Sequence, residues 1–362
     1  MLDSRAVSPA DRHLTDQMRI DWNRRGAEDH RLHIAAGHQS SEETFLASGE
    51  QDLAGLVLDG IDLESHAEAL EIGCGVGRLL LPLAKRVATV YGVDISPVMI
   101  KKSKDYTAKT RNVFTSVTDG TLASRPDASL DLVFSFIVFQ HIPDRAPIRT
   151  YVEESSRVLK PGGVLRFQVD GRWWWKHGKG GPDTYDGVRF SPGDVHDLLA
   201  GLPLTLVDEW GAGGHYHWVT ARKEGRGAAL RLRMRTWDMA ILASVLARLG
   251  ARNPESDAVD IREGRESLHP HLQRLEDRLV DAEDGVLVDE AYRTLLGRKA
   301  DEDGRAFHVS VLKRRLENRA ALLDTFVMSR EFLELVRPHA PELSAGIAGE
   351  VLGPDAVGMR AR

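Results

Sequence analysis

The sequence has little cysteine, no long apolar segment and no excess of positive charge, and each lack excludes a class of protein. Its 362 residues include one cysteine, Cys74, which has no disulfide partner in the chain, so we expect a reducing compartment. No apolar run approaches the roughly 18 to 20 residues that cross a membrane, and the start Met-Leu-Asp-Ser-Arg is too polar for a signal peptide. The formal net charge of -6 gives no basic footprint for nucleic acid. We therefore expect a cytoplasmic protein that does not bind nucleic acid, and no metal-binding cluster is visible.

The most informative stretch runs from Ala69 to Ala84. It begins as a buried strand, turns through Gly73, Gly75 and Gly77, and continues into an apolar segment long enough for a helix. This order is typical of a nucleotide-binding site, because glycine lets the backbone approach a ligand and the helix start presents free N–H groups. A tight connection without a ligand is the alternative.

Neighbouring residues indicate which nucleotide derivative the turn binds. A dinucleotide fingerprint requires glycine or alanine at the position of Arg78, and the turn follows an acid, Glu71. The first feature weakens a dinucleotide interpretation, whereas an acidic strand end and glycine amides suit a cationic adenosine derivative without pyrophosphate, which describes S-adenosylmethionine. Asp94, at the end of the next expected strand (87–93), can accept both ribose hydroxyls. Alternatively, it caps the helix that begins near Ser96 and Pro97.

Five blocks between positions 69 and 169, among them Glu71-x-Gly-x-Gly-x-Gly77 and Leu159-Lys-Pro-Gly-Gly163, resemble class I S-adenosylmethionine-dependent methyltransferases. The resemblance implies an α/β fold: a doubly wound, seven-stranded, mostly parallel Rossmann-like sheet with an antiparallel last strand. It also implies that Ile95 and Asp119 contact the adenine and that the backbone near Phe136 approaches the methionine part. Without the resemblance, Asp119-Gly120 is simply a turn. The cofactor residues that we expect are Glu71, Gly73, Gly75, Gly77, Asp94, Ile95, Asp119, Gly120 and Phe136.

The acceptor side is expected in an aromatic, glycine-rich insertion, residues 171–187, at the carboxyl ends of the strands. The candidate substrate residues are Trp174, Tyr185, His215 and His217. His141, which follows the fourth strand, is the candidate general base for a hydroxyl acceptor. A structural histidine bonded to the backbone is the alternative for all three histidines.

We divide the chain into a helical segment that covers the cofactor site (1–65, with a helix over 51–63), a methyltransferase domain (66–224), an amphipathic helix and linker (225–279), a small helical domain (280–337) and a flexible tail (338–362). The segment 228–249 either contacts a membrane as a basic amphipathic helix or packs between domains or subunits, which leaves oligomers open. Residues 280–337 resemble a helical bacterial domain of unknown function with phycobilisome-linker-like sequence, which often accompanies glycan-processing enzymes. Asp301 in this domain is expected to cap a helix rather than bind calcium.

These observations predict an S-adenosylmethionine-dependent methyltransferase that methylates a hydroxyl of a carbohydrate or glycolipid in glycan biosynthesis. One alternative is a lipid, quinone or other small-metabolite acceptor. Another is a catalytically inactive, methyltransferase-like binding or scaffold protein.

Overall fold

The computed structural model describes residues 9–34, 41–172, 184–185, 187–212, 214–225, 230–232, 238–262, 268–313 and 319–337. Trp174 and the tail 338–362 lie outside the described residues, as does most of the aromatic insertion.

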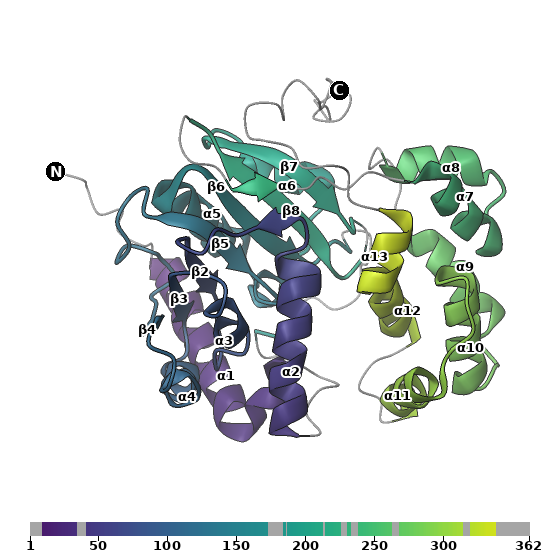
Figure 1. Cartoon of the computed structure of the whole chain (residues 1–362), viewed down its shortest axis with the longest axis horizontal. Helices are drawn as coiled ribbons and strands as arrows, with labels where there is room; N and C mark the ends of the chain where they lie inside the picture. The colour runs from purple at the N-terminus through teal and green to yellow at the C-terminus, as the bar shows by residue number, and fades with distance from the viewer. Residues whose placement is uncertain are drawn as a thin grey trace.

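A seven-stranded sheet organises the first two thirds of the chain, in the order β4-β3-β2-β5-β6-β8-β7 (Figure 1). Strands β2 to β6 pair in parallel, whereas β8 is antiparallel to both of its neighbours. This arrangement confirms the predicted fold class. The strands are β2 (Glu68–Ile72), β3 (Thr89–Asp94), β4 (Val113–Val117), β5 (Leu130–Ser135), β6 (Leu159–Val169), β7 (Leu204–Trp210) and β8 (His217–Lys223).

Helices cover both faces of this sheet because its central strands are apolar on both sides. Leu70 and Ile72 of β2 pack in one layer with α5 (Arg145–Val158) and α6 (Pro192–Leu199). Ala69 packs in the opposite layer with η1 (Leu53–Val57) and α3 (Leu80–Leu83). The helix α4 (Pro97–Thr107) begins where expected, with the Ser96 side chain accepting the N–H of Met99.

The helix after the glycine turn is much shorter than the sequence suggested. It contains only Leu80–Leu83, and Pro82 within it has no N–H to donate to the preceding turn. The polypeptide still continues in turns on both sides, with Ala84 N–H bonded to the carbonyl of Leu80. The glycine turn therefore opens onto one short helical turn.

The N-terminal region is helical as expected but contains one unexpected strand. The long helix α1 (Pro9–Ile34) is kinked at Asp29, and α2 (Glu42–Asp52) continues into η1. The helix predicted over 51–63 ends early, because β1 (Ile61–Asp62) pairs antiparallel with β9 (Arg231–Leu232). A pairing between segments so distant in sequence has no local signature.

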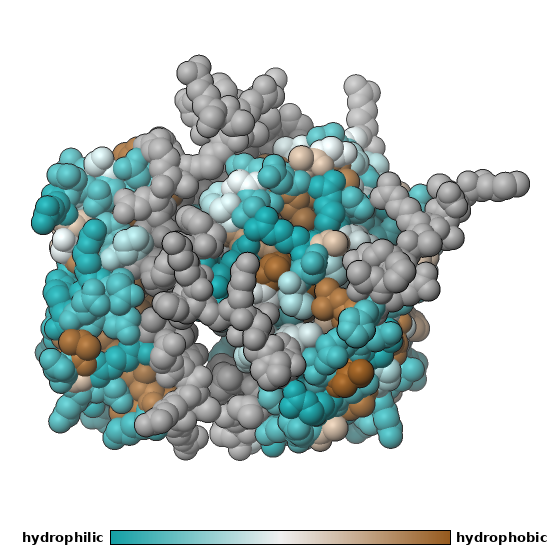
Figure 2. Space-filling model, turned by 180° about the vertical axis from the view of Figure 1, so that it is seen from behind, coloured by the Kyte–Doolittle hydropathy of each residue, from teal (hydrophilic) through white to brown (hydrophobic). Residues whose placement is uncertain are grey.

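The basic amphipathic helix expected over 225–249 is wrong in its first part, because the β1–β9 pairing places a strand there. Arg231 belongs to β9, and the helix α7 (Met239–Arg248) begins only after it. Leu242, Val245 and Leu246 of α7 are fully buried, so this apolar face packs inside the chain. No helix of the described residues is long and apolar enough to span a membrane. Figure 2 shows one side of the molecule, where the coloured surface is mostly hydrophilic and its apolar residues form separate small patches.

Helices occupy the rest of the described chain, and α8 lies where the sequence suggested a linker. These helices are α8 (Pro254–Arg262), α9 (His269–Arg278), α10 (Asp284–Leu295), α11 (Glu302–Lys313), α12 (Arg319–Met328) and α13 (Arg330–Val336). As expected, Asp301 caps α11 by accepting the N–H of Gly304 at 2.8 Å.

The C-terminal helices share a hydrophobic core with the sheet. One apolar cluster runs from Leu132 and Trp218 in the sheet to Leu242 of α7 and Phe332 of α13. Arg337, which directly follows α13, is buried and forms an ion pair with Asp208 of β7. The N–H of Asp238 bonds to the carbonyl of Val336 at 3.0 Å. The two regions are therefore joined by apolar packing and by polar contacts.

Candidate functional site

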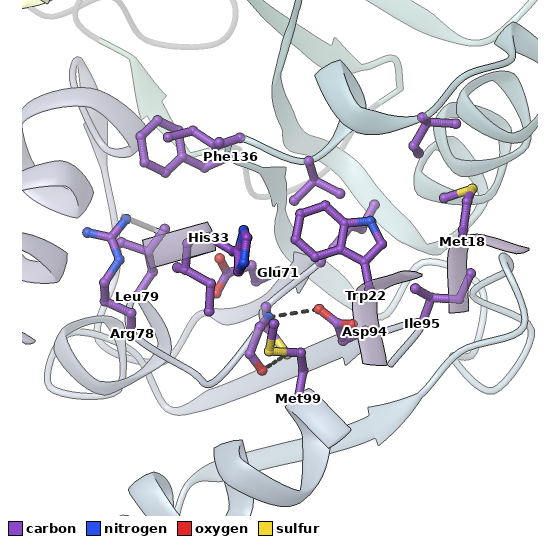
Figure 3. A pocket seen from close by; sticks show the side chains of 18 of the residues that line it. Met18, Trp22, His33, Glu71, Arg78, Leu79, Asp94, Ile95, Met99 and Phe136 are labelled. Atoms are coloured by element: carbon purple, nitrogen blue, oxygen red, sulfur yellow. Dashed lines mark hydrogen bonds between the residues drawn. The ribbon is translucent and has the colours of Figure 1, made fainter. Parts of the chain in front are cut away.

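A pocket lies at the carboxyl ends of β2, β3 and β5, and α1 supplies part of its wall (Figure 3). The parallel strands bring their ends to one edge of the sheet, where ligands bind in this architecture. The pocket is lined by Met18, Trp22, His33, Ile34, Glu71, Ile72, Gly73, Cys74, Gly75, Arg78, Leu79, Asp94, Ile95, Met99, Phe136, Ile137, Val138, Ile142 and Tyr151.

Two carboxylates face this pocket from neighbouring strands. Glu71 is 3% exposed, and its Oε2 has no hydrogen-bond partner among the described residues. Burial raises the pKa of Glu71 to about 8. The Oδ2 of Asp94 accepts the N–H of Gly75 at 2.9 Å, and its Oδ1 accepts the N–H of Ser96 at 2.8 Å. Burial raises the pKa of Asp94 to about 6, although both backbone bonds favour its charged form.

The glycine turn approaches its neighbours too closely for side chains. Gly73 has a φ of +75°, and a Cβ there would lie 2.3 Å from Val138. Gly75 has a φ of +53° and would place its Cβ 2.9 Å from Ile34 of α1. Gly77 instead faces Ser103 and Thr107, both on α4, and does not line the pocket. Its requirement for glycine therefore comes from packing against α4 and from its φ of +86°.

The helix α1 contributes residues that sequence reasoning did not assign to the site. Met18, His33 and Ile34 line the pocket together with Trp22, which the sequence had suggested only as part of a covering element. The kink at Asp29 changes the direction of the chain just before His33. Burial lowers the pKa of His33, which favours the neutral imidazole.

Arg78, the residue that weakened the dinucleotide interpretation, also lines the pocket. It is 4% exposed, and its Nη1 donates to Asp52 at 2.5 Å and to Ser48 at 2.9 Å, both on α2. Arg78 therefore ties the glycine turn to the N-terminal region. Tyr151 of α5 is a further lining residue that the sequence did not indicate.

Besides Gly77, two further expected cofactor residues, Asp119 and Gly120, lie away from the pocket lining. Asp119 is exposed, and its Oδ1 accepts the N–H of Thr121 at 3.2 Å and the hydroxyl of Thr121 at 2.8 Å. Gly120, with a φ of +102°, lies opposite Thr15 of α1. The Asp119 carboxylate thus closes its own turn. Of the other expected residues, Glu71, Gly73, Gly75, Asp94, Ile95 and Phe136 line the pocket.

His141 is buried and does not line the pocket. Its Nδ1 lies 2.5 Å from the carbonyl oxygen of Tyr185, and its Nε2 lies 3.3 Å from the side-chain nitrogen of Gln140. The ring also packs against Tyr185, with centroids 4.7 Å apart, and against Trp22. Both ring nitrogens of His141, the candidate general base, therefore face protein groups rather than the pocket.

The candidate substrate histidines also lie outside this pocket lining. His217 is fully buried, and its Nε2 lies 2.7 Å from Oε1 of Glu209. Burial and the neighbouring Arg172 lower the pKa of His215 to about 4. His217 thus contacts Glu209 of β7, and His215 lies near Arg172 in the segment after β6. Tyr185 is 45% exposed beside His141.

Comparisons with known proteins bear on the two regions separately. Residues 70–167 match the family model described as a methyltransferase domain, and residues 277–336 match a domain of unknown function, DUF4214. The chain is 36% identical over 108 residues to a 2-methyl-6-phytyl-1,4-hydroquinone methyltransferase of Synechocystis, covering 29% of this chain and 33% of that protein.

Two further relatives are also named as methyltransferases of quinone compounds or of their biosynthesis. A ubiquinone biosynthesis O-methyltransferase of Bartonella tribocorum is 26% identical over 159 residues, covering 40% of this chain and 63% of the relative. A demethylmenaquinone methyltransferase of Tropheryma whipplei is 32% identical over 98 residues, covering 27% and 39%. The chain thus spans between one third and just under two thirds of the length of these relatives.

These matches agree with the expected enzyme class and with S-adenosylmethionine as cofactor. They give no support for a resemblance to phycobilisome linkers or for a glycan acceptor. The chain carries a class I methyltransferase domain, followed by a C-terminal DUF4214 helical region.

Proposed function

We propose that this protein is an S-adenosylmethionine-dependent methyltransferase whose acceptor is a small, flat and largely apolar molecule of the hydroquinone class. The observation that carries the proposal is the convergence of Glu71, Asp94 and the glycine turn on one pocket. The donor set fits the cofactor, because a buried carboxylate oxygen without a partner suits a cation and glycine leaves room for a ligand. When bound, S-adenosylmethionine supplies an activated methyl group on a sulfonium.

The roles of the residues follow from their chemistry. Asp94 accepts the ribose hydroxyls while the backbone N–H groups of Gly75 and Ser96 hold its carboxylate in place. Glu71 pairs with the positive end of the cofactor, which draws the glutamate into its charged form. The protein contributes to the rate chiefly by alignment, which can lower a barrier by roughly 7 to 11 kcal/mol.

The acceptor class rests on the wall of the pocket and on the relatives. Phe136, Val138, Ile142 and Trp22 form an apolar surface, and Phe136 stacks on Trp218 with ring centroids 5.5 Å apart. Such a wall favours a flat apolar ring over a sugar, which needs many polar partners. The three relatives described above are named for hydroquinone, ubiquinone and demethylmenaquinone methylation.

A hydroxyl acceptor must lose a proton, and His33 is placed to accept it. His33 lines the pocket, and its lowered pKa keeps the imidazole neutral near pH 7. A positioned general base typically contributes about 10² to 10⁴ in rate. His141 is less suited to this role, because both of its ring nitrogens face protein groups.

The experiment is methyl transfer from tritiated S-adenosylmethionine to a panel of acceptors. The panel contains 1,4-naphthalenediol, catechol, a monosaccharide and a bacterial glycolipid extract, and the products are identified by mass spectrometry. We expect a diol to be methylated. Methylation of the sugars alone contradicts the acceptor class, and cofactor binding without transfer to any acceptor supports a binding or scaffold protein. Failure to bind S-adenosylmethionine in calorimetry contradicts the whole proposal.

A further inference from the structure

Ile137 has a backbone conformation that β-branched residues rarely adopt. Its φ is +55°, and Ala128 is the other non-glycine residue with positive φ in the described part of the chain. The left-handed region is unfavourable for an L-residue because Cβ approaches the following carbonyl oxygen, and a β-branched residue there is an outlier. Such strain persists only where the surroundings hold it. Ile137 lies in the pocket wall between Phe136 and Val138, so the strain occurs at the candidate site.

The side chain of Gln168 holds this strained residue. Its Oε1 accepts the N–H of Ile137 at 3.0 Å, and its Nε2 donates to Oε1 of Gln140 at 2.5 Å. Gln168 lies on β6 and is fully buried. Apolar residues are the rule in such interior strands, and a buried amide is costly unless it is hydrogen-bonded. Both ends of this amide are bonded, one of them to the strained turn.

The backbone of Gln140 also contacts the end of the aromatic insertion. The carbonyl of Gln140 accepts the N–H of Gly187 at 2.8 Å, and a Cβ at Gly187 would lie 2.4 Å from that carbonyl oxygen. The N–H of Thr184 in turn donates to Asp21 of α1 at 3.0 Å. Gln168 thus lies between the strained pocket wall and a segment that contacts the covering helix.

We propose that Gln168 is a positioning residue for methyl transfer. It holds Ile137 in the left-handed conformation and thereby fixes the wall formed by residues 136–138, against which cofactor and acceptor are aligned. Gln168 does not line the pocket itself, so it acts through the backbone of Ile137. This inference rests on the proposed function, because it assigns a role within that reaction.

The test compares Gln168→Leu with Gln168→Glu and Val164→Ala in the full-length protein. Leucine removes all three hydrogen bonds of the amide at similar volume, including one of 3.4 Å from Nε2 to the carbonyl of His215, whereas glutamate keeps the acceptor for Ile137 but loses the Nε2 donor. Val164 is a buried residue in the middle of β6, and its truncation controls for a general loss of stability. The measurements are thermal stability, amide hydrogen exchange of residues 135–140, the Kd for S-adenosylhomocysteine, and turnover of the diol that the wild-type protein methylates.

In Gln168→Leu we expect exchange at Ile137 at least about tenfold faster, a Kd at least about fivefold higher, and a larger fall in turnover, since small misplacements can cost about 10²-fold. Gln168→Glu should have a Kd between those of the wild type and Gln168→Leu, because it keeps the acceptor for Ile137 while its second carboxylate oxygen faces the acceptors on Gln140 and His215. Val164→Ala should melt at a lower temperature but keep its Kd and turnover. A Gln168→Leu protein that behaves like Val164→Ala overturns the proposal.

A second substitution separates a positioning role from a packing defect. Glycine adopts positive φ at little cost, so Ile137→Gly combined with Gln168→Leu should recover most of the lost affinity. Recovery supports the proposal, and a double variant as weak as Gln168→Leu contradicts it. A wild-type protein that binds no S-adenosylhomocysteine contradicts the proposed function, whereas normal wild-type binding with an unaffected Gln168→Leu contradicts only the role of Gln168.

Discussion

Asp94 and Gly75 are joined by a hydrogen bond of 2.9 Å from the glycine N–H to Oδ2 of the carboxylate. The bond links the end of β3 to the turn that follows β2, so the two halves of the proposed adenosyl site hold each other in place. The carboxylate also accepts the N–H of Ser96 and keeps lone pairs for a ligand. Asp94 can therefore hold the glycine turn and bind the ribose hydroxyls at the same time, so substitutions at this one position test the ribose role.

Asp94→Ala should weaken S-adenosylmethionine binding about 10²-fold, because hydrogen bonds to a charged group contribute about 1.5 to 3 kcal/mol each. Asp119→Asn is the control, since the structure places Asp119 outside the pocket lining. It should keep the wild-type Kd within threefold in titration calorimetry. Equal losses in both variants contradict the position of the site.

Gly75→Ala and Gly201→Ala form a matched pair for the glycine turn. Both positions have positive φ, but Gly75 faces Ile34 in the pocket whereas Gly201 has nothing within 4 Å. Gly201→Ala should cost about 1 kcal/mol of folding free energy in denaturant titrations, and Gly75→Ala somewhat more, because its Cβ also meets Ile34. Only Gly75→Ala should also lose affinity for the cofactor. If Gly201→Ala weakens binding equally, the loss reflects general instability rather than the turn.

The affinity for S-adenosylmethionine should rise as the pH increases from 6 to about 8. In the ligand-free protein burial raises the pKa of Glu71 to about 8, so the residue is mostly neutral below that value. A bound cation favours the carboxylate, and binding therefore releases a proton. Calorimetry in buffers of different ionisation enthalpy counts that proton. Glu71→Gln should bind more weakly, and its affinity should show a smaller pH dependence.

The same pKa shift makes a prediction about stability without ligand. The folded pKa of Glu71 lies above its unfolded value, so the folded state holds the proton more tightly. Relative to Glu71→Gln, the ligand-free wild-type protein should lose stability as the pH rises from about 4.5 to about 8. Thermal melts of both proteins across this range measure the difference. A constant difference would mean that Glu71 titrates normally.

His33→Asn should slow methylation of a diol by about 10² to 10⁴ at pH 7.5. His33 has a lowered pKa, so wild-type turnover should fall only at a pH below 6.5, where the imidazole becomes protonated. That acidic decline should disappear in His33→Asn, while His66→Asn, an exposed control in the turn before β2, keeps the wild-type profile. If the His33→Asn variant keeps wild-type turnover, His33 is not the base.

The parts of the site that could be predicted are those fixed by local sequence. Asp94 is the last residue of β3 and Glu71 the last but one of β2, and the ends of parallel strands meet at one edge of a sheet. The glycines between them mark backbone that must turn sharply. Sequence alone therefore indicated both acids and the turn that contact the pocket.

The remaining lining residues come from tertiary packing that leaves no local pattern. His33 and Met18 both line the pocket from α1, although the kink at Asp29 separates them along the helix. Conversely, Asp119 was expected at the pocket, but its carboxylate bonds to Thr121 instead. The pairing of β1 with β9 was also hidden, because it joins segments about 170 residues apart.

Arg337→Ala should destabilise the whole chain rather than the C-terminal helices alone. Arg337 is 2% exposed and pairs with Asp208 of β7, and one apolar cluster continues from the sheet into α7 and α13. Removing one partner leaves the other charge without its counterion, which for a buried pair costs about 3 to 5 kcal/mol. Because Asp208 keeps some exposure, we expect the variant to lose about 2 to 4 kcal/mol of unfolding free energy. Urea unfolding followed by tryptophan fluorescence and by far-ultraviolet circular dichroism should give one coincident transition at a lower midpoint.

Arg293→Ala, which removes an exposed pair with Glu290, is the control and should change stability by less than about 1 kcal/mol. Two separate transitions in Arg337→Ala would instead mean that the sheet and the C-terminal helices fold as independent units.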